Sequence, residues 1–187
     1  MAIQETIEDL KSYAKLERVL ALFCVASPLV MIVADGGVRD SISAYYDMTE
    51  NQLFYFPLTA ASLLFLVNGF VKKRNWYNAW LGIMLAGVVL LNYQSFTWYH
   101  GAFALAFFVG NAAVMVFYSR EVSRRFRVAV LIGVVLAFLA WRPFGWYSLF
   151  WAEWISLGLI ASHFLLDAST HVQYRAAERG EGPALAS

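Results

Sequence analysis

Apolar residues in this chain gather into six segments separated by short polar stretches. The segments lie near residues 16–34, 53–71, 76–91, 96–118, 126–141 and 146–166. A helix needs about 20 predominantly apolar residues to cross a bilayer, and the third and fifth segments are shorter than that. The pattern predicts an all-α, polytopic membrane protein. We expect a six-transmembrane-helix bundle that forms a single membrane domain over residues 1–172.

The two ends of the chain have a different character. Residues 1–18 mix acidic and basic side chains, and Ile3, Ile7, Leu10 and Ala14 recur at helical spacing. This predicts an amphipathic N-terminal helix that either lies at the membrane interface or extends into solvent. Residues 173–187 are small and polar, which predicts a disordered cytoplasmic tail.

Composition supports the membrane class. The chain has 187 residues, of which 60% are hydrophobic and 14% charged, and its mean hydropathy is +0.57. A soluble domain is about a quarter charged. The net charge of +1 gives no indication of a nucleic-acid partner. Cys24 is the single cysteine, so an intrachain disulfide is impossible.

Basic residues predict the orientation. If six helices alternate in direction, twelve of the fourteen Lys and Arg residues fall on one side, and only Arg39 and Arg142 on the other. The positive-inside rule then places both termini in the cytoplasm. The long 35–52 loop and the two other outer connections would face the opposite side of the membrane.

The last apolar segment carries an unusual polar stripe. Glu153, Ser156, His163, Asp167 and His171 fall within an arc of roughly 80° at about 100° per residue. Ionisable groups in hydrocarbon are costly, so we expect this face to point into the bundle.

The fourth segment offers matching polar groups. His100 and Asn111 are about three turns apart, and this helix should run in the same direction as the last one. The sequence therefore predicts that the two helices face each other at two levels, with His100 beside Glu153 near the outer end. Asn111 and His163 would lie roughly 15 Å deeper. We expect a neutral His163 that hydrogen-bonds Asn111 or a residue of the third helix. An outward cavity and ordinary interhelical hydrogen bonding both explain the pattern.

The long loop is the expected lid of this cavity. Its polar residues are densest at 41–47, and a structureless connection of such length is unusual unless it packs or binds. A histidine or Arg142 is expected to decide whether Glu153 stays ionised. The candidate ligand-binding residues are Ser41, Ser43, Tyr46, Asp47, His100, Asn111, Arg142, Glu153 and His163.

Two catalytic patterns can be drawn, and neither has a supporting motif. A metal site from His100, Glu153 and a loop aspartate lacks an HxxxH or HExxH spacing. A triad of Ser41 or Ser43 with His100 and Asp40 or Asp47 lacks a GxSxG elbow. We therefore predict no metal, no cofactor and no catalytic residue.

The residues of the 41–46 loop (SISAYY), His100 and the Trp151-Ala152-Glu153 stretch resemble an uncharacterised family of small bacterial membrane proteins. This resemblance implies a bacterial cytoplasmic (inner) membrane protein without a known activity. Asp47 stands where that family has a histidine. A fainter similarity links His100 and Asn111 to the CREST superfamily of membrane hydrolases, which implies a zinc site, but Asn111 is an amide where CREST proteins have an aspartate.

These observations lead to one expectation and two alternatives. We expect an acid-rich outer pocket that binds a lipid, a small molecule or a partner protein without turning over a substrate. Membrane lipids are the expected partners, with a membrane protein or a second copy of the chain as further candidates. The alternatives are a metal-dependent lipid hydrolase of degenerate CREST type and an ion or proton pathway in an oligomer. We also expect that Glu153→Leu could stabilise the bundle by removing a buried charge.

Overall fold

The computed structural model describes residues 2–71, 76–119 and 122–178, with side chains for 15–70, 76–119 and 122–169. Within these residues the chain is all-α and has no strand. The elements in order are α1 (Ala2–Asp35), the 3-10 helix η1 (Ile42–Asp47), α2 (Gln52–Val71), α3 (Tyr77–Leu90), α4 (Thr97–Tyr118), α5 (Arg124–Trp141) and α6 (Leu149–Glu178).

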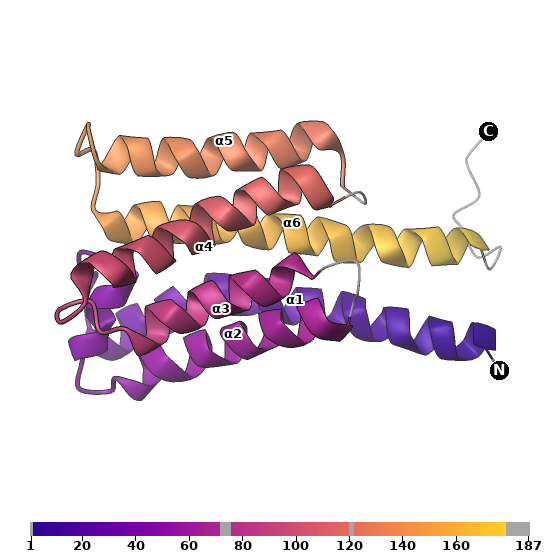
Figure 1. Cartoon of the computed structure of the whole chain (residues 1–187), viewed down its shortest axis with the longest axis horizontal. Coiled ribbons are helices and arrows are strands. Elements are labelled where there is room, and N and C mark those ends of the chain that lie inside the picture. Colours follow the sequence, from indigo (N-terminus) through magenta and orange to yellow (C-terminus); the bar gives the residue numbers. More distant parts are fainter. Residues whose placement is uncertain (1, 72–75, 120–121, 179–187) are drawn as a thin grey trace.

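The α-helices form a closed antiparallel bundle (Figure 1). Each packs against the next along the chain, and α6 returns to pack against α1. One end of the bundle, which we call the loop end, carries η1 and the α3–α4 and α5–α6 connections. The beginning of α1 and the end of α6 lie together at the opposite end, as an even number of alternating helices requires.

The first and last helices are longer than the sequence pattern predicts. α1 runs without a break from Ala2 to Asp35, so the expected amphipathic helix and the first apolar segment are one element. The side chains of the expected amphipathic face lie outside the described residues. α6 continues to Glu178 and takes in the beginning of the predicted tail, while residues 179–187 also lie outside the description.

Four of the described helical stretches are long and apolar enough to cross a membrane, not the six that the sequence pattern predicts. They are Lys15–Asp35, Gln52–Phe70, Thr97–Tyr118 and Leu149–Ser169. α3 is apolar but has only 14 residues, which at 1.5 Å per residue spans about 21 Å of a roughly 30 Å hydrocarbon core. The first turn of α5 consists largely of arginines, so the apolar stretch that follows is too short to count as a spanning helix.

Aromatic rings fill the centre of the bundle. Phe65 of α2 is fully buried, and its ring packs edge-on against Phe107 of α4 at 5.7 Å and Phe164 of α6 at 5.6 Å. Such edge-to-face pairs are favoured by the ring quadrupole. This cluster joins three helices that are far apart in the sequence.

Small residues set the distance between α2 and α3. A Cβ on Gly82 of α3 would lie 2.8 Å from the Ser62 carbonyl oxygen and 2.9 Å from the Leu66 backbone nitrogen. The Ser62 hydroxyl donates to the Gly82 carbonyl oxygen at 2.8 Å. Close backbone approach and an interhelical hydrogen bond are the means by which helices associate where lipid removes the hydrophobic driving force.

We predict that Gly82→Ala destabilises the protein by about 1–3 kcal/mol, because backbone atoms of α2 must move to admit the methyl group. Gly158→Ala is the matched control, since a Cβ there meets nothing within 4 Å. Thermal unfolding of both variants in detergent measures the difference. Equal melting temperatures would show that the α2–α3 contact tolerates separation.

Candidate functional site

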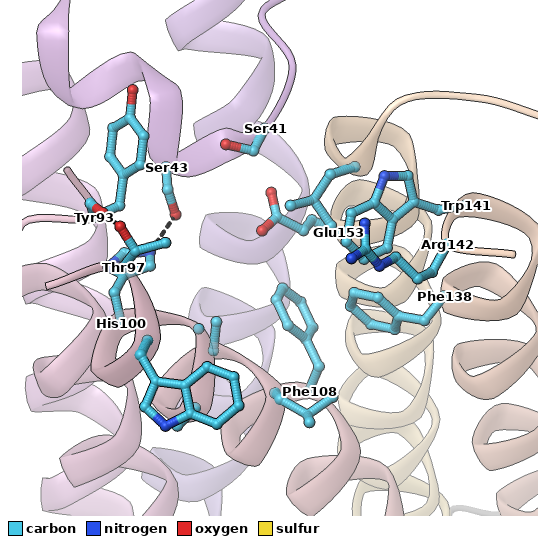
Figure 2. A pocket seen from close by; sticks show the side chains of 16 residues that line it. Ser41, Ser43, Tyr93, Thr97, His100, Phe108, Phe138, Trp141, Arg142 and Glu153 are labelled. Atoms are coloured by element: carbon cyan, nitrogen blue, oxygen red, sulfur yellow. Dashed lines mark hydrogen bonds between the residues drawn. The ribbon is translucent and has the colours of Figure 1, made fainter. Parts of the chain in front are cut away.

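A cavity of about 700 Å³ opens at the loop end between η1, α4, α5 and α6. Most of its wall is apolar and comes from α4 and α5. Its polar groups belong to a few side chains, which Figure 2 shows around the cavity. Those discussed below are Ser41, Ser43, His100, Arg142 and Glu153.

The position of the cavity follows from the helix packing. α4 packs mainly on α3 and α5, and α6 mainly on α1 and α5, so α4 and α6 have little direct contact. The two helices that the sequence predicts to face each other therefore do so at this end across a cavity, with little direct contact. At the loop end, the space between them is the cavity, and η1 packs against α6 at its edge.

His100 joins η1 to α4. The Ser43 hydroxyl lies 2.7 Å from His100 Nε2, and the Leu91 carbonyl oxygen lies 2.7 Å from His100 Nδ1. A carbonyl can only accept, so Nδ1 carries a hydrogen. In the neutral ring Nε2 is then the acceptor, and the Ser43 hydroxyl donates to it.

Glu153 joins η1 to α6. Its Oε2 accepts a hydrogen bond from the Ile42 backbone N–H at 2.7 Å, and the residue is only 5% exposed. The structure therefore brings His100 and Glu153 to the same short 3-10 helix, at neighbouring residues. The partner of the Glu153 carboxyl group is thus the Ile42 N–H, and not a histidine or Arg142 as the sequence suggested.

Further bonds fix the loop before η1. Arg39 pairs with Asp35 through two hydrogen bonds, of 2.6 and 2.7 Å, and also donates to the Ala44 carbonyl oxygen at 2.8 Å. The bond to Asp35 raises the pKa of Arg39. The Tyr45 side chain is fully buried and donates to the Gly37 carbonyl oxygen, and burial raises its pKa. The loop is thus a packed element, as its length suggested.

The remaining predicted loop residues divide between two roles. Ser41 lines the cavity, and its hydroxyl caps η1 by accepting from the Ala44 N–H at 3.1 Å. Tyr46 packs edge-on against Tyr55 of α2 and does not line the cavity. Asp47 is exposed and accepts hydrogen bonds from Tyr93 and Gln94, so it ties η1 to the α3–α4 connection.

Arg142 lies at the end of α5 on the cavity wall. It is exposed, and its guanidinium carbon lies 5.6 Å from the centre of the Trp141 ring. In the view of Figure 2, Phe138, Trp141 and Arg142 lie across the cavity from Ser43 and His100, with Glu153 between them. The cavity therefore has one cationic edge and an uncharged serine–histidine edge.

The deeper level differs from the prediction. His163 is buried, and its Nε2 lies 3.1 Å from the hydroxyl of Ser119, which follows α4. Asn111 is also buried, but it does not contact His163 through a hydrogen bond, and its Nδ2 has no such partner among the described residues. The prediction that Asn111 bonds His163 is therefore wrong, because the described bond of His163 is to Ser119. Neither residue lines the cavity.

The cavity is less acidic than the sequence suggests. The sequence assigns five acids to the outer side, and of these only Glu153 lines the cavity; the other four are Asp35, Asp40, Asp47 and Glu50. Within the described part of the chain, no three His, Cys, Asp or Glu side chains are placed to hold a metal ion together. The ligand set implied by the CREST resemblance is thus not assembled among these residues.

Sequence reasoning missed the backbone groups that complete the site. The Ile42 N–H and the Leu91 carbonyl oxygen hold Glu153 and His100, and backbone groups leave no trace in residue type. Tyr45 belongs to the polar 41–47 stretch, yet its ring packs against Phe150 at the start of α6. The polar neighbours of Tyr45 in the sequence give no sign that its side chain is completely buried.

The helices and the cavity define an all-α protein with several helices apolar enough for a membrane. The chain belongs to a family of unknown function, DUF7103, which matches residues 26–168. The matched region runs from α1 through η1 to α6 and contains every residue of the cavity wall. No curated protein and no solved structure matches the chain.

The bond to Ile42 changes the expectation for Glu153. Glu153→Leu leaves the buried Ile42 N–H without an acceptor, which costs about 1–3 kcal/mol. Glu153→Gln keeps a carbonyl oxygen that can accept from Ile42. We therefore predict that the leucine variant melts at a lower temperature than the glutamine variant. The reverse order would show that desolvation of the carboxylate outweighs its hydrogen bond.

Proposed function

We propose that this protein is a polytopic membrane protein whose loop-end cavity binds an anionic membrane lipid. The cavity of about 700 Å³, with a long apolar wall and a cationic edge, is the observation that supports this most directly. Ligand cavities in proteins commonly have about 300–1,000 Å³ and are mostly apolar with a few placed polar groups. A small molecule or a partner protein remains the alternative occupant.

The apolar wall suits an acyl chain. Ala104, Leu105 and Phe108 of α4 face the cavity together with Phe138 of α5. Leu105 is 56% exposed and Trp98, another cavity residue, is 84% exposed. Such exposed apolar side chains are stable in contact with hydrocarbon. A lipid tail can therefore pass from the bilayer along α4 into the cavity without crossing water.

The polar edge suits a headgroup. The Arg142 guanidinium is a fork of donors for phosphate oxygens, and it is one of only two basic residues assigned to this end of the bundle. The Ser41 and Ser43 hydroxyls and His100 add neutral hydrogen-bonding groups opposite it. This arrangement favours a negatively charged headgroup over a zwitterionic one.

The proposed membrane topology keeps six crossings. α2 and α4 are long enough to span, and both begin at the loop end, so α3 must carry the chain back across. The same argument applies to α5 between α4 and α6. Arg124, Arg125 and Arg127 at the start of α5 belong to the end opposite the cavity. By the positive-inside rule this end, which carries both termini, faces the cytoplasm. A bacterial inner membrane is the location that the family resemblance implies.

Cysteine accessibility tests this topology. In a Cys24→Ala background, Ser95→Cys on the α3–α4 connection should react with a membrane-impermeant maleimide added to intact cells. Ser123→Cys, just before α5, should react only after the membrane is permeabilised. The opposite labelling pattern would place the cavity on the cytoplasmic side and overturn the orientation.

Native mass spectrometry of the full chain tests the ligand class. We expect phosphatidylglycerol to bind more tightly than phosphatidylcholine of the same acyl composition. Arg142→Gln should weaken phosphatidylglycerol binding about fivefold, as expected for an exposed ionic contact of about 1 kcal/mol, and leave phosphatidylcholine unchanged. Arg125→Gln removes the same charge at the opposite end and should change neither affinity. Equal binding of both lipids in all three proteins would overturn the proposed anionic ligand.

A further inference from the structure

We propose that Ser43 and His100 form a nucleophile–base pair that hydrolyses a carboxylic ester of an amphipathic lipid in this cavity. The substrate class rests on the proposed lipid-binding function. The pair itself rests on the geometry of two hydrogen bonds and on its place at the cavity wall.

The two hydrogen bonds run in the direction that acyl transfer needs, with the serine hydroxyl donating to the histidine. A serine is activated when its hydroxyl donates to a base and a third group orients that base. Here the Ser43 Oγ to His100 Nε2 distance is 2.7 Å, and the Leu91 carbonyl oxygen holds the opposite ring nitrogen at 2.7 Å. The carbonyl fixes the tautomer in which Nε2 is free to take a proton.

The loop aspartates do not supply the third member of a triad. Asp47 is exposed and bonds Tyr93 and Gln94, while the backbone of Asp40 accepts from the Phe150 N–H. A main-chain carbonyl therefore performs the orienting role that a carboxylate has in a Ser-His-Asp triad. It orients the ring but adds no full negative charge to stabilise the imidazolium.

Ser43 is held in place by its neighbours and is largely buried, but it borders the cavity. It is the second residue of η1. The residue before it, Ile42, is bonded to Glu153, and the residue after it, Ala44, is bonded to Arg39 and Ser41. Both Ser43 and His100 nevertheless line the large cavity, so a bound molecule can reach the hydroxyl. A hydrogen bond that served only to pack η1 on α4 would have no need to border that space.

The cavity places an ester on this pair. In this proposal the acyl chain lies along Ala104, Leu105 and Phe108, the anionic headgroup lies near Arg142, and the ester linkage extends across the cavity toward Ser43. Figure 2 shows the two edges on opposite sides of the cavity. Binding of the two ends of the substrate would hold the carbonyl in place for attack.

The reaction balances with water as the co-reactant. Ser43 Oγ attacks the ester carbonyl carbon while its proton passes to His100 Nε2. The carbon–oxygen bond to the alcohol breaks, and the alcohol leaves with that proton, which gives an acyl-Ser43 ester. Water then attacks the acyl carbon, gives a proton to His100, and Ser43 Oγ leaves and regains it. The products are a carboxylic acid and an alcohol.

A fluorophosphonate probe tests the pair on the purified full chain. We expect one adduct per protein, located at Ser43 by peptide mass spectrometry of the wild type. His100→Gln removes the base but keeps an amide that can donate to Leu91, and it should slow labelling about 100-fold or more. The wild-type labelling rate should rise with pH through one ionisation that is missing in His100→Gln.

Two further variants separate chemistry from structure. Ser43→Ala should lose the adduct and the hydrolysis of p-nitrophenyl butyrate, while Ser27→Ala, a buried serine of α1 outside the cavity, should keep both. Wild-type protein that binds phosphatidylglycerol but gains no adduct at Ser43 would overturn the pair and leave the proposed function standing. An adduct at Ser43 without lipid binding would support the pair and overturn the lipid ligand. An unchanged labelling rate in His100→Gln would overturn the role of His100 as base.

Discussion

The hydrogen bond from the Ile42 N–H to Glu153 determines how the loop end of this protein is built. A carboxylate or carboxylic acid on an apolar helix needs a partner, because apolar surroundings offer none. η1 supplies that partner from its backbone, and so it must lie directly against α6. The Asp35–Arg39 pair and the buried Tyr45 ring then follow from the same requirement, since they hold the loop in that position.

Ile42 of η1 bonds α6, and the following residue, Ser43, contacts α4. Ser43 and His100 bond across this contact, and Leu91 completes the histidine. The two helices remain apart at this level because a loop segment, and not a direct side-chain contact, connects them. The cavity is the space left beside that connection, walled by the aromatic residues of α4 and α5. Nearer the opposite end, His163 and the Ser119 hydroxyl close the gap between α4 and α6.

This arrangement explains why polar residues with similar spacing have different roles. His100 and Glu153 border open space and bind short backbone or hydroxyl groups, so their environment can accept a ligand. His163 and Asn111 are buried and do not line this cavity, and buried polar residues between helices contribute to bundle association. The two levels on α6 are separated by buried apolar residues, among them Leu157, Ile160 and Ala161.

The sequence by itself determined the all-α class, the approximate positions of the helices and the inward face of α6. These depend on hydrophobic runs and on the 3.6-residue period, which act locally along the chain. Glu153, Ser156, His163 and Asp167 are all buried, as predicted from the cost of leaving polar and ionisable groups in apolar surroundings without a partner. The count of six apolar segments exceeds the four described stretches that are long and apolar enough to span by themselves, because α3 is short and the first turn of α5 carries arginines.

Only the tertiary structure decided which polar groups meet. Residue spacing placed His100 and Glu153 at similar depth, but it could not show that the Ile42 N–H and the Leu91 carbonyl oxygen would be their partners, because every residue carries the same backbone groups. It also offered Asn111 or a residue of the third helix as the partner of His163, whereas the structure places the Ser119 hydroxyl there. Crossing angles and distances between helices depend on side chains that are far apart in sequence, such as Gly82 against Ser62. For that reason the cavity and its serine–histidine edge became visible only in three dimensions.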